Sequence, residues 1–326
     1  MPRATSIVLC TYNGARFLEA QWESLLAQSR RPDEIVVRDD GSTDGTPALL
    51  ARLRVRAEAQ GIRVSIAGNA HNLGYSANFA AALQGATGEV LYLCDQDDVW
   101  HPDKLATLSA AFDRRPELLL ACTDARRVDA AGVDLGRSLF GVLRITRAEF
   151  RAIHRGDGFA VLLRRSMATG ATVALRRTLL ADALPVPPGW VHDEWLAIVA
   201  AALGGFDCIE RRLIDYRQHG GNQIGMPGRG LREKWDDLRR PRADLIEMLI
   251  ARDEWLAKRL RRLREKVQQG CIECASAKLA HMRVRHGIAG APCARVAPIL
   301  RETFDGGYRR FGTGWRSALR DFLRRR

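Results

Sequence analysis

The feature that most restricts the fold is an alternation of short apolar runs with amphipathic segments in the N-terminal part of the chain. The apolar runs have the length of buried strands, and the segments between them repeat leucine and aromatic residues at helical spacing. Strands joined through helices form right-handed crossovers, which place neighbouring strands parallel. The sequence therefore predicts an α/β fold with helices flanking a mostly parallel sheet. The predicted strands are 6–10, 34–38, 62–67, 89–94, 118–122, 168–175 and 208–216.

Polar side chains follow three of these strands directly. Thr11, Tyr12 and Asn13 follow the first strand, Asp39 and Asp40 follow the second, and an acidic run at 95–98 follows the fourth. In an open parallel sheet, ligands bind beyond the carboxyl ends of the strands. We therefore expect the three clusters to line one crevice.

The acidic run places Asp95, Asp97 and Asp98 within four positions at the end of an apolar strand. Carboxylates gathered in this way repel one another and are costly to remove from water. A hard divalent cation such as Mg²⁺ or Mn²⁺ would relieve both costs, because it takes oxygen ligands and shares them with substrate phosphates. For an isolated run a solvated acidic turn is the simpler interpretation, but its position at a strand end favours a metal site.

Positive charge is concentrated in the C-terminal part. The whole chain carries a net charge of +13, and residues 231–326 contribute 24 basic and 12 acidic residues to it. This part reads as long basic amphipathic helices, interrupted near the end by glycines at 306, 307, 312 and 314. Such an asymmetry indicates an anionic partner, either a membrane surface or nucleic acid.

Other features of the sequence indicate where in the cell the protein is expected. No apolar run reaches the length of a membrane-spanning helix, and the N-terminus lacks the apolar core of a secretory signal. The seven cysteines are odd in number and lie mostly in apolar runs, which favours buried free thiols. Cys271 and Cys274 have metal-knuckle spacing without a second pair at zinc-ribbon distance, so a zinc site is disfavoured. We expect a cytoplasmic protein.

Three motifs carry a resemblance to a known family. The segments 7–14 (IVLCTYNG), 39–46 (DDGSTDGT) and 95–100 (DQDDVW) resemble those of family 2 glycosyltransferases, over roughly residues 5–225. The resemblance implies the GT-A fold, a Rossmann-like nucleotide-binding α/β domain. The last motif, together with 192–195 (HDEW) and 216–222 (YRQHGGN), resembles bacterial enzymes that build surface polysaccharide, among them rhamnosyltransferases.

The resemblance, together with the change to basic amphipathic helices near residue 231, divides the chain into two regions. Residues 1–230 would form the nucleotide-sugar-binding and catalytic domain. Residues 231–326 would form a basic amphipathic helical region that faces a membrane or a partner. 

The resemblance also assigns roles to residues of the first region. An ionised carboxylate only accepts hydrogen bonds, which suits a base N–H and ribose hydroxyls. For Asp39 and Asp40 an ordinary turn is the alternative. The residues implied to bind the nucleotide are Thr11, Tyr12, Asn13, Asp39, Asp40, Asn78 and Asp95, and those implied to bind Mg²⁺ or Mn²⁺ are Asp97, Asp95 and His219.

The catalytic base is implied at Asp193, with Glu194 as the second choice, because an acceptor hydroxyl must lose a proton as it attacks. The alternative for Asp193 is a helix start, where the helix dipole favours an acidic side chain. For His219 the alternative is an exposed loop histidine. Gly170, Arg217 and Asn222 would contact the diphosphate or the acceptor.

Together these assignments predict an inverting, metal-dependent transfer of a sugar, rhamnose being one candidate, from a nucleotide diphosphate sugar to a glycan. The acceptor is expected to be polyprenyl-linked, in surface polysaccharide, lipopolysaccharide or O-antigen assembly, with the enzyme peripheral on the inner face of the cell membrane. A sugar nucleotidyltransferase would need a glycine- and lysine-rich triphosphate loop, whereas residues 11–16 read TYNGAR. A nucleic-acid-binding protein is disfavoured because no recognition motif appears and the charge avoids the motif-bearing region.

Overall fold

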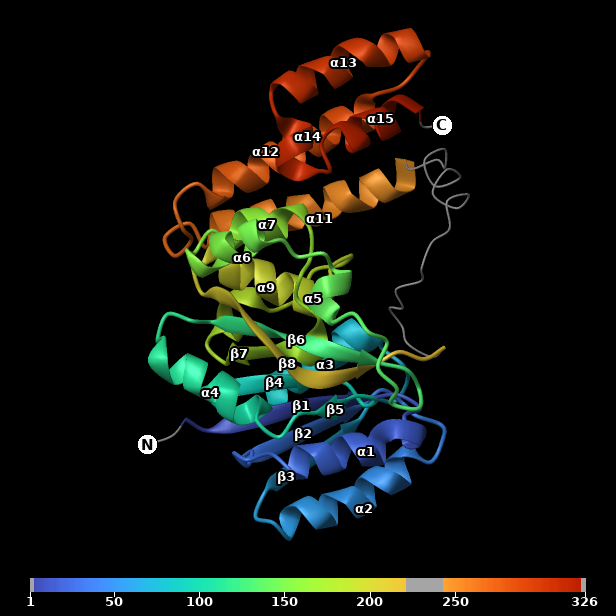
Figure 1. The fold of residues 1–326 in the computed structure, drawn as a ribbon, viewed down its shortest axis with the longest axis vertical. Helices are drawn as coiled ribbons and strands as arrows, with labels where there is room; N and C mark the ends of the chain where they lie inside the picture. The colour runs from blue at the N-terminus through green and yellow to red at the C-terminus, as the bar shows by residue number, and fades with distance from the viewer. Residues whose placement is uncertain (1–2, 221–242, 324–326) are drawn as a thin grey trace. The chain divides into compact units, whose positions relative to one another are not determined.

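The computed structural model describes residues 3–220 and 243–323, which form two compact units (Figure 1). Within the described ranges, the first unit comprises residues 3–159, 166–186 and 191–220. The second comprises residues 160–165, 187–190 and 243–323. The predicted boundary between residues 230 and 231 lies outside the described residues, so it stays a prediction.

A single eight-stranded sheet organises the first unit, in the order β3-β2-β1-β4-β7-β6-β8-β5. β1 pairs parallel with both β2 and β4, and β2 pairs parallel with β3, as expected for strands joined by crossover helices. β7 runs antiparallel between β4 and β6, and β5 runs antiparallel to β8. The α/β prediction with a mostly parallel sheet is therefore confirmed. The strands are β1 (Thr5–Thr11), β2 (Glu34–Asp39), β3 (Arg63–Gly68), β4 (Val90–Cys94), β5 (Val99–Trp100), β6 (Leu120–Val128), β7 (Val173–Arg176) and β8 (Phe206–Arg217).

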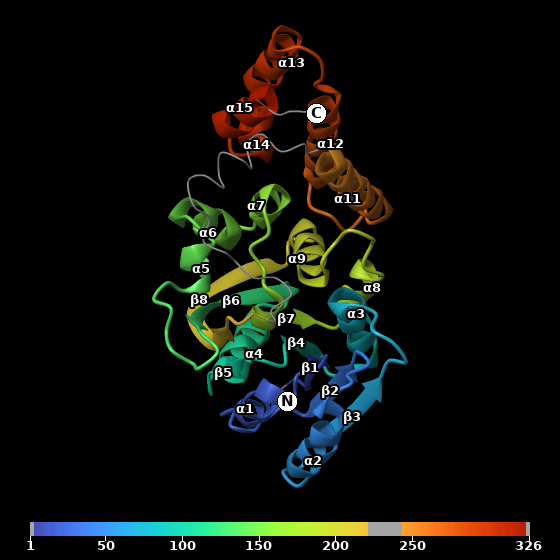
Figure 2. The ribbon, with the colours of Figure 1, turned by 90° about the vertical axis from the view of Figure 1, so that its right-hand side faces the viewer.

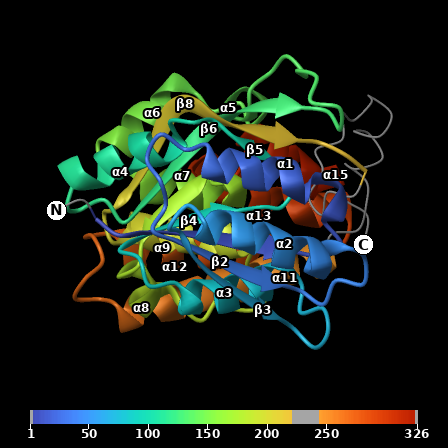
Figure 3. The ribbon, with the colours of Figure 1, turned by 90° about the horizontal axis from the view of Figure 1, so that it is seen from below.

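Helices cover both faces of the sheet. Figure 2 shows α1 and α2 on one side of β1–β3 and α3 on the other, and Figure 3 shows α1 and α2 side by side. The helices are α1 (Ala15–Leu26), α2 (Thr46–Glu58), α3 (Tyr75–Gly85), α4 (Lys104–Arg114), α5 (Leu139–Val142), α6 (Arg147–His154), α7 (Gly158–Arg164), α8 (Leu179–Ala183) and α9 (His192–Ala202).

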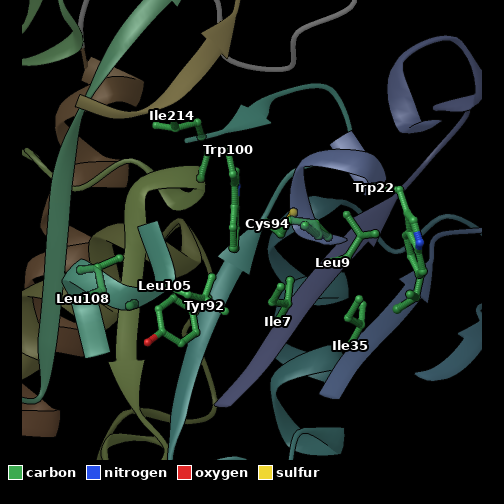
Figure 4. Close-up of a cluster of buried hydrophobic side chains, with 14 of the residues drawn as sticks. Ile7, Leu9, Trp22, Ile35, Tyr92, Cys94, Trp100, Leu105, Leu108 and Ile214 are labelled. Carbon is green, nitrogen blue, oxygen red and sulfur yellow. The ribbon is translucent and has the colours of Figure 1, made fainter. Parts of the chain in front are cut away.

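The core under α1 and α2 follows from strand geometry. Successive side chains of a strand point to opposite faces, so Ile7 and Leu9 of β1 and Ile35 of β2 face the same side. There they pack with Trp22 of α1, and all four side chains are fully buried (Figure 4). Burial of such side chains stabilises the fold by about 1.5–3 kcal/mol each.

One predicted strand is shorter than expected. Residues 168–175 were predicted as a strand, but Gly170–Thr172 form a 3₁₀ turn and β7 begins only at Val173. The turn is closed at Thr172, whose backbone N–H and hydroxyl both donate to the carbonyl of Thr169, at 2.8 and 2.7 Å. A hydroxyl that bonds the local backbone in this way competes with the sheet ladder.

The second unit consists of helices. They are α11 (Ala243–Arg262), α12 (Cys271–Gly287), α13 (Pro292–Phe304), α14 (Gly307–Phe311) and α15 (Trp315–Leu323), together with residues 160–164 of α7. The predicted interruptions by glycine are confirmed: Gly306 and Gly314 have positive φ and separate α13, α14 and α15. No described helix is long and apolar enough to cross a membrane.

Candidate active site

The loops after β1 and β2 are joined by a network of side chains. Asn13 accepts a hydrogen bond from the N–H of Thr43 (2.9 Å) and donates its own N–H to the hydroxyl of Ser42 (2.8 Å). Its φ of 49° lies in the left-handed region that asparagine tolerates. Asp39 accepts from the hydroxyls of Thr11 (2.7 Å) and Ser42 (2.6 Å). These bonds hold two predicted nucleotide-binding loops against each other.

Asp40 ties the same region to the start of α3. Its carboxylate accepts from the backbone N–H groups of Leu73 (2.8 Å) and Gly74 (2.9 Å) and from the amide of Asn69 (2.6 Å). The amide of Asn69 also donates to the side chain of Asn78 (2.9 Å). Asp40 is buried, so one effect of its charge is to fix where α3 begins.

Gln96 connects the acidic run to the first loop. Its amide accepts from the N–H of Tyr12 (2.8 Å) and donates to the carbonyl of the same residue (2.9 Å). This approach requires a glycine at position 14, because a Cβ there would lie 2.0 Å from Oε1 of Gln96. The pair places Asp95 and Asp97, on either side of Gln96, next to the loop at Tyr12.

Asp97 and His219 come together although they are far apart in sequence. Oδ2 of Asp97 lies 2.8 Å from Nε2 of His219, and both side chains are largely buried. The ring of His219 packs on Phe17 with centroids 4.7 Å apart. Arg217 donates to the carbonyl oxygens of Asp97 (2.8 Å) and Ala130 (3.0 Å), so its guanidinium holds the end of β8 against the acidic run.

The acidic run brings carboxylates together in a buried place, which raises their pKa values. Burial and the neighbouring charge of Asp97 raise the pKa of Asp95 to about 7. The same causes raise the pKa of Asp98, whose Oδ2 has no hydrogen-bond partner among the described residues. Oxygen and imidazole ligands fit Mg²⁺ or Mn²⁺. No group of three or more His, Cys, Asp or Glu side chains converges within the described residues. A cation held by Asp97 and His219 would therefore take further ligands from phosphate and water.

Lys104 is a residue that the sequence analysis missed. It is fully buried, its ammonium donates to the carbonyl of Ala171 (2.6 Å), and it lies 3.6 Å from the ring centroid of Trp100. Burial lowers the pKa of Lys104 to about 7, against the attraction of Cys94, Asp98 and Asp95. A lysine in the first turn of a helix opposes the helix dipole. That mismatch is visible in the sequence, but it does not reveal that Lys104 is buried.

The predicted base lies at the start of α9. Oδ2 of Asp193 accepts from the N–H of Gly170 (2.7 Å), and Oδ1 accepts from the N–H of Glu194 (2.7 Å). Burial raises the pKa of Asp193 to about 6, although these hydrogen bonds lower it. Tyr75 faces the same place, since burial and the charges of Asp193 and Glu194 raise its pKa.

The structure thus places the predicted residues in three groups. Asn222 lies outside the described residues. The groups are Thr11, Asn13, Asp39, Asp40 and Asn78; Asp95, Asp97, Arg217 and His219, with Tyr12 attached through Gln96; and Gly170, Asp193 and Glu194.

Known sequences resemble this chain over part of its length. An uncharacterized glycosyltransferase of Nostoc sp. is 28% identical over 230 residues, 67% of this chain and 65% of that protein. An uncharacterized protein of Mycobacterium tuberculosis is 28% identical over 219 residues, 66% of this chain and 58% of that protein. The chain therefore spans less than two thirds of these relatives. A Bacillus subtilis protein named as a glycosyltransferase of teichuronic acid biosynthesis is 32% identical over 100 residues, 31% of this chain and 38% of that protein.

Solved structures share the fold across the whole chain. TarS residues 1–349 of S. aureus, crystallised with UDP-GlcNAc, superpose with a TM-score of 0.54 and 16% identity, covering 98% of this chain and 89% of that one. The mannosyltransferase of Pyrobaculum calidifontis, in complex with GDP-Man and Mn²⁺, superposes with a TM-score of 0.52 and 19% identity, covering 99% of this chain and 85% of that one. The GT-A prediction is thereby confirmed. The model of glycosyl transferase family 2 matches residues 6–170, half of the chain, and the chain belongs to that family.

Proposed function

We propose that this chain is an inverting, divalent-metal-dependent glycosyltransferase that uses a nucleotide diphosphate sugar. The observation that carries the proposal is Asp193, a single buried carboxylate held by the N–H of Gly170, with a pKa near 6. At neutral pH it is mostly ionised and able to take the proton of an acceptor hydroxyl, in the range where general bases are efficient. No second carboxylate is assigned as a nucleophile, which favours a single displacement with inversion.

The loops after β1, β2 and β4 would bind the donor. The network of Thr11, Asn13 and Asp39 is already organised by internal hydrogen bonds, which reduces the entropy lost on binding. Asp97 and His219, with Asp95 beside them, would hold Mg²⁺ or Mn²⁺. When bound, such a cation supplies positive charge that stabilises the leaving diphosphate. The fold neighbour with GDP-Man and Mn²⁺ supports a metal-assisted donor site.

The acceptor is proposed to be a polyprenyl-linked glycan of surface polysaccharide assembly. The similarity to the teichuronic acid glycosyltransferase supports a surface polymer. Rhamnose is the donor sugar favoured by the resemblance of the motifs to those of rhamnosyltransferases.

The second unit is proposed to place the enzyme peripherally on the inner face of the cell membrane. On α13, Leu300 and Phe304 are 49% and 86% exposed, and on α15, Trp315 and Leu319 are 70% and 41% exposed. Each pair is four residues apart and thus lies on one helix face. Exposed arginines accompany them, such as Arg301. Basic helices with an exposed apolar face bind anionic bilayers.

The test of the function is sugar transfer or donor hydrolysis with a panel of nucleotide sugars, including dTDP-rhamnose, in Mn²⁺, Mg²⁺ or EDTA. Asp193→Asn should lower turnover by roughly 10²–10⁴ and keep donor affinity. Asp157→Asn, a change at an exposed aspartate, is the matched control and should behave as the parent. Turnover by Asp193→Asn at the parental rate would reject the assignment of the base, and full turnover in EDTA would reject the metal.

A further inference from the structure

His192, which precedes the predicted base Asp193, has a ring fixed by aromatic packing and ring nitrogens that lack hydrogen-bond partners among the described residues. His192 is only 3% exposed, and its ring stacks on Phe79 of α3 with centroids 4.3 Å apart and an interplanar angle of 15°. Tyr75, one turn earlier in α3, approaches the same ring edge-on at 6.1 Å. Aromatic packing on two sides therefore fixes the orientation of the imidazole.

Neither ring nitrogen of His192 has a hydrogen-bond partner among the described residues. Burial lowers the pKa of His192 to about 3, so the ring is neutral and carries one N–H donor and one acceptor nitrogen. Leaving a buried polar group unpaired costs about 1–3 kcal/mol. An unpaired buried group of this kind is rare in folded proteins, where it is explained by local strain, an ordered water, a bound ion or a functional role.

One ring nitrogen of His192 lies close to the carboxylate of the base, and both groups pack beside Gly170. A Cβ built on Gly170 would lie 3.2 Å from Nε2 of His192 and 3.6 Å from Oδ2 of Asp193. Because position 170 is a glycine, the imidazole and the carboxylate can both pack closely against its backbone. The two groups therefore lie next to each other beside Gly170.

We propose that Nε2 of His192 binds a hydroxyl of the acceptor sugar, next to the hydroxyl that Asp193 deprotonates. The inference rests on the proposed function. A hydroxyl is the matching ligand, since it both donates and accepts and can pair with either tautomer of a neutral imidazole. A phosphate or carboxylate would bind most tightly to a cationic ring, which burial opposes. His192 is thereby a specificity-determining residue for the acceptor.

The test is His192→Phe, which keeps an aromatic ring to stack on Phe79 and removes both nitrogens. The free protein should melt a few degrees higher, because two unpaired polar atoms are removed. The acceptor KM should rise so that kcat/KM for the acceptor falls about tenfold or more, the loss of one hydrogen bond to substrate. The donor KM and donor hydrolysis should not change. His192→Gln, which supplies an amide, should recover part of the loss.

His154→Phe is the matched control. His154 also stacks on a phenylalanine, Phe150, but its Nδ1 lies 2.7 Å from Oδ1 of Asp207. This variant should melt lower than the parent and keep the parental acceptor KM.

Two results would overturn the inference. If His192→Phe melts below the parent, the nitrogens are paired within the free protein. If its acceptor kcat/KM equals that of the parent, the nitrogens do not read the acceptor. A parent chain that transfers no sugar would reject the proposed function instead, and the melting comparison would still decide whether His192 is unpaired.

Discussion

Replacing Asp193 by asparagine should make the chain progressively more stable than its parent as the pH rises. The folded protein holds the pKa of this carboxyl at about 6, well above its ordinary value of 3.8. A difference of about two pKa units corresponds to about 3 kcal/mol of unfolding free energy. In the parent this penalty arises because the folded state buries a carboxylate that the unfolded state exposes to water.

The sign follows from proton binding. In strong acid Asp193 is protonated in both states, and no penalty exists. As the pH rises between the two pKa values, the unfolded chain releases its proton first, so the parent loses stability until the folded pKa is passed. Asparagine cannot ionise and is free of this loss.

Urea unfolding at pH 5 and pH 8 measures the effect. About half of the penalty is already present at pH 5, so the stability gap between variant and parent should widen by about 1.4 kcal/mol from pH 5 to pH 8. Hydrogen bonds to Asp193 from the N–H groups of Gly170 and Glu194 contribute an offset common to both pH values. The same gap at both pH values would refute the raised pKa, and Asp157→Asn should show a constant gap.

Three further outcomes are expected. The parental kcat/KM should be about tenfold lower at pH 5 than at pH 7, because a base with a pKa of about 6 is mostly protonated at pH 5, and a flat pH–rate profile would contradict this. Gly14→Ala should cost about 0.5–1.5 kcal/mol, because the side chain of Gln96 must turn away and lose its hydrogen bonds to the backbone of Tyr12, and an unchanged melting temperature would speak against that packing. A Phe304→Ser, Trp315→Ser double variant should float less with phosphatidylglycerol vesicles than the parent, whereas Val55→Ser, an equally apolar exposed site in α2, should not. Equal flotation of all three would remove the case for this membrane surface.

The fold was predictable because its signal is local. Each of the strands β1, β2 and β4 is an apolar run closed by turn residues, and the crossover rule then dictates their parallel pairing. The segment at Gly170 was mispredicted because its apolar residues fit a strand equally well. The turn is held by the N–H and the hydroxyl of Thr172, which both donate to the carbonyl of Thr169, and these hydrogen bonds are seen only in the structure.

The candidate site was predictable where motifs carry it and not where tertiary contacts create it. Asp193 and Asp97 were found because each lies within a recognisable motif. Lys104 was missed because its importance comes from complete burial beside Trp100 and Ala171, which no spacing encodes. The unpaired nitrogens of His192 were invisible for the same reason, since they depend on how α3 packs beside α9.

The two-residue strand β5 helps to bring together Asp97 and His219, the two residues proposed to hold the cation. Val99 and Trp100 pair with Asp215 and Ile214 of β8, immediately after the acidic run and shortly before His219. This edge pairing aligns two segments that the chain separates by more than a hundred residues. A cation bound by Asp97 and His219 would therefore connect the segment before β5 to the segment after β8 at this edge of the sheet. Binding of the cation should therefore stabilise the pairing of β5 with β8. Amide exchange at Val99 and Trp100 should become slower when donor is added with Mg²⁺, which is diamagnetic and replaces Mn²⁺ in this measurement.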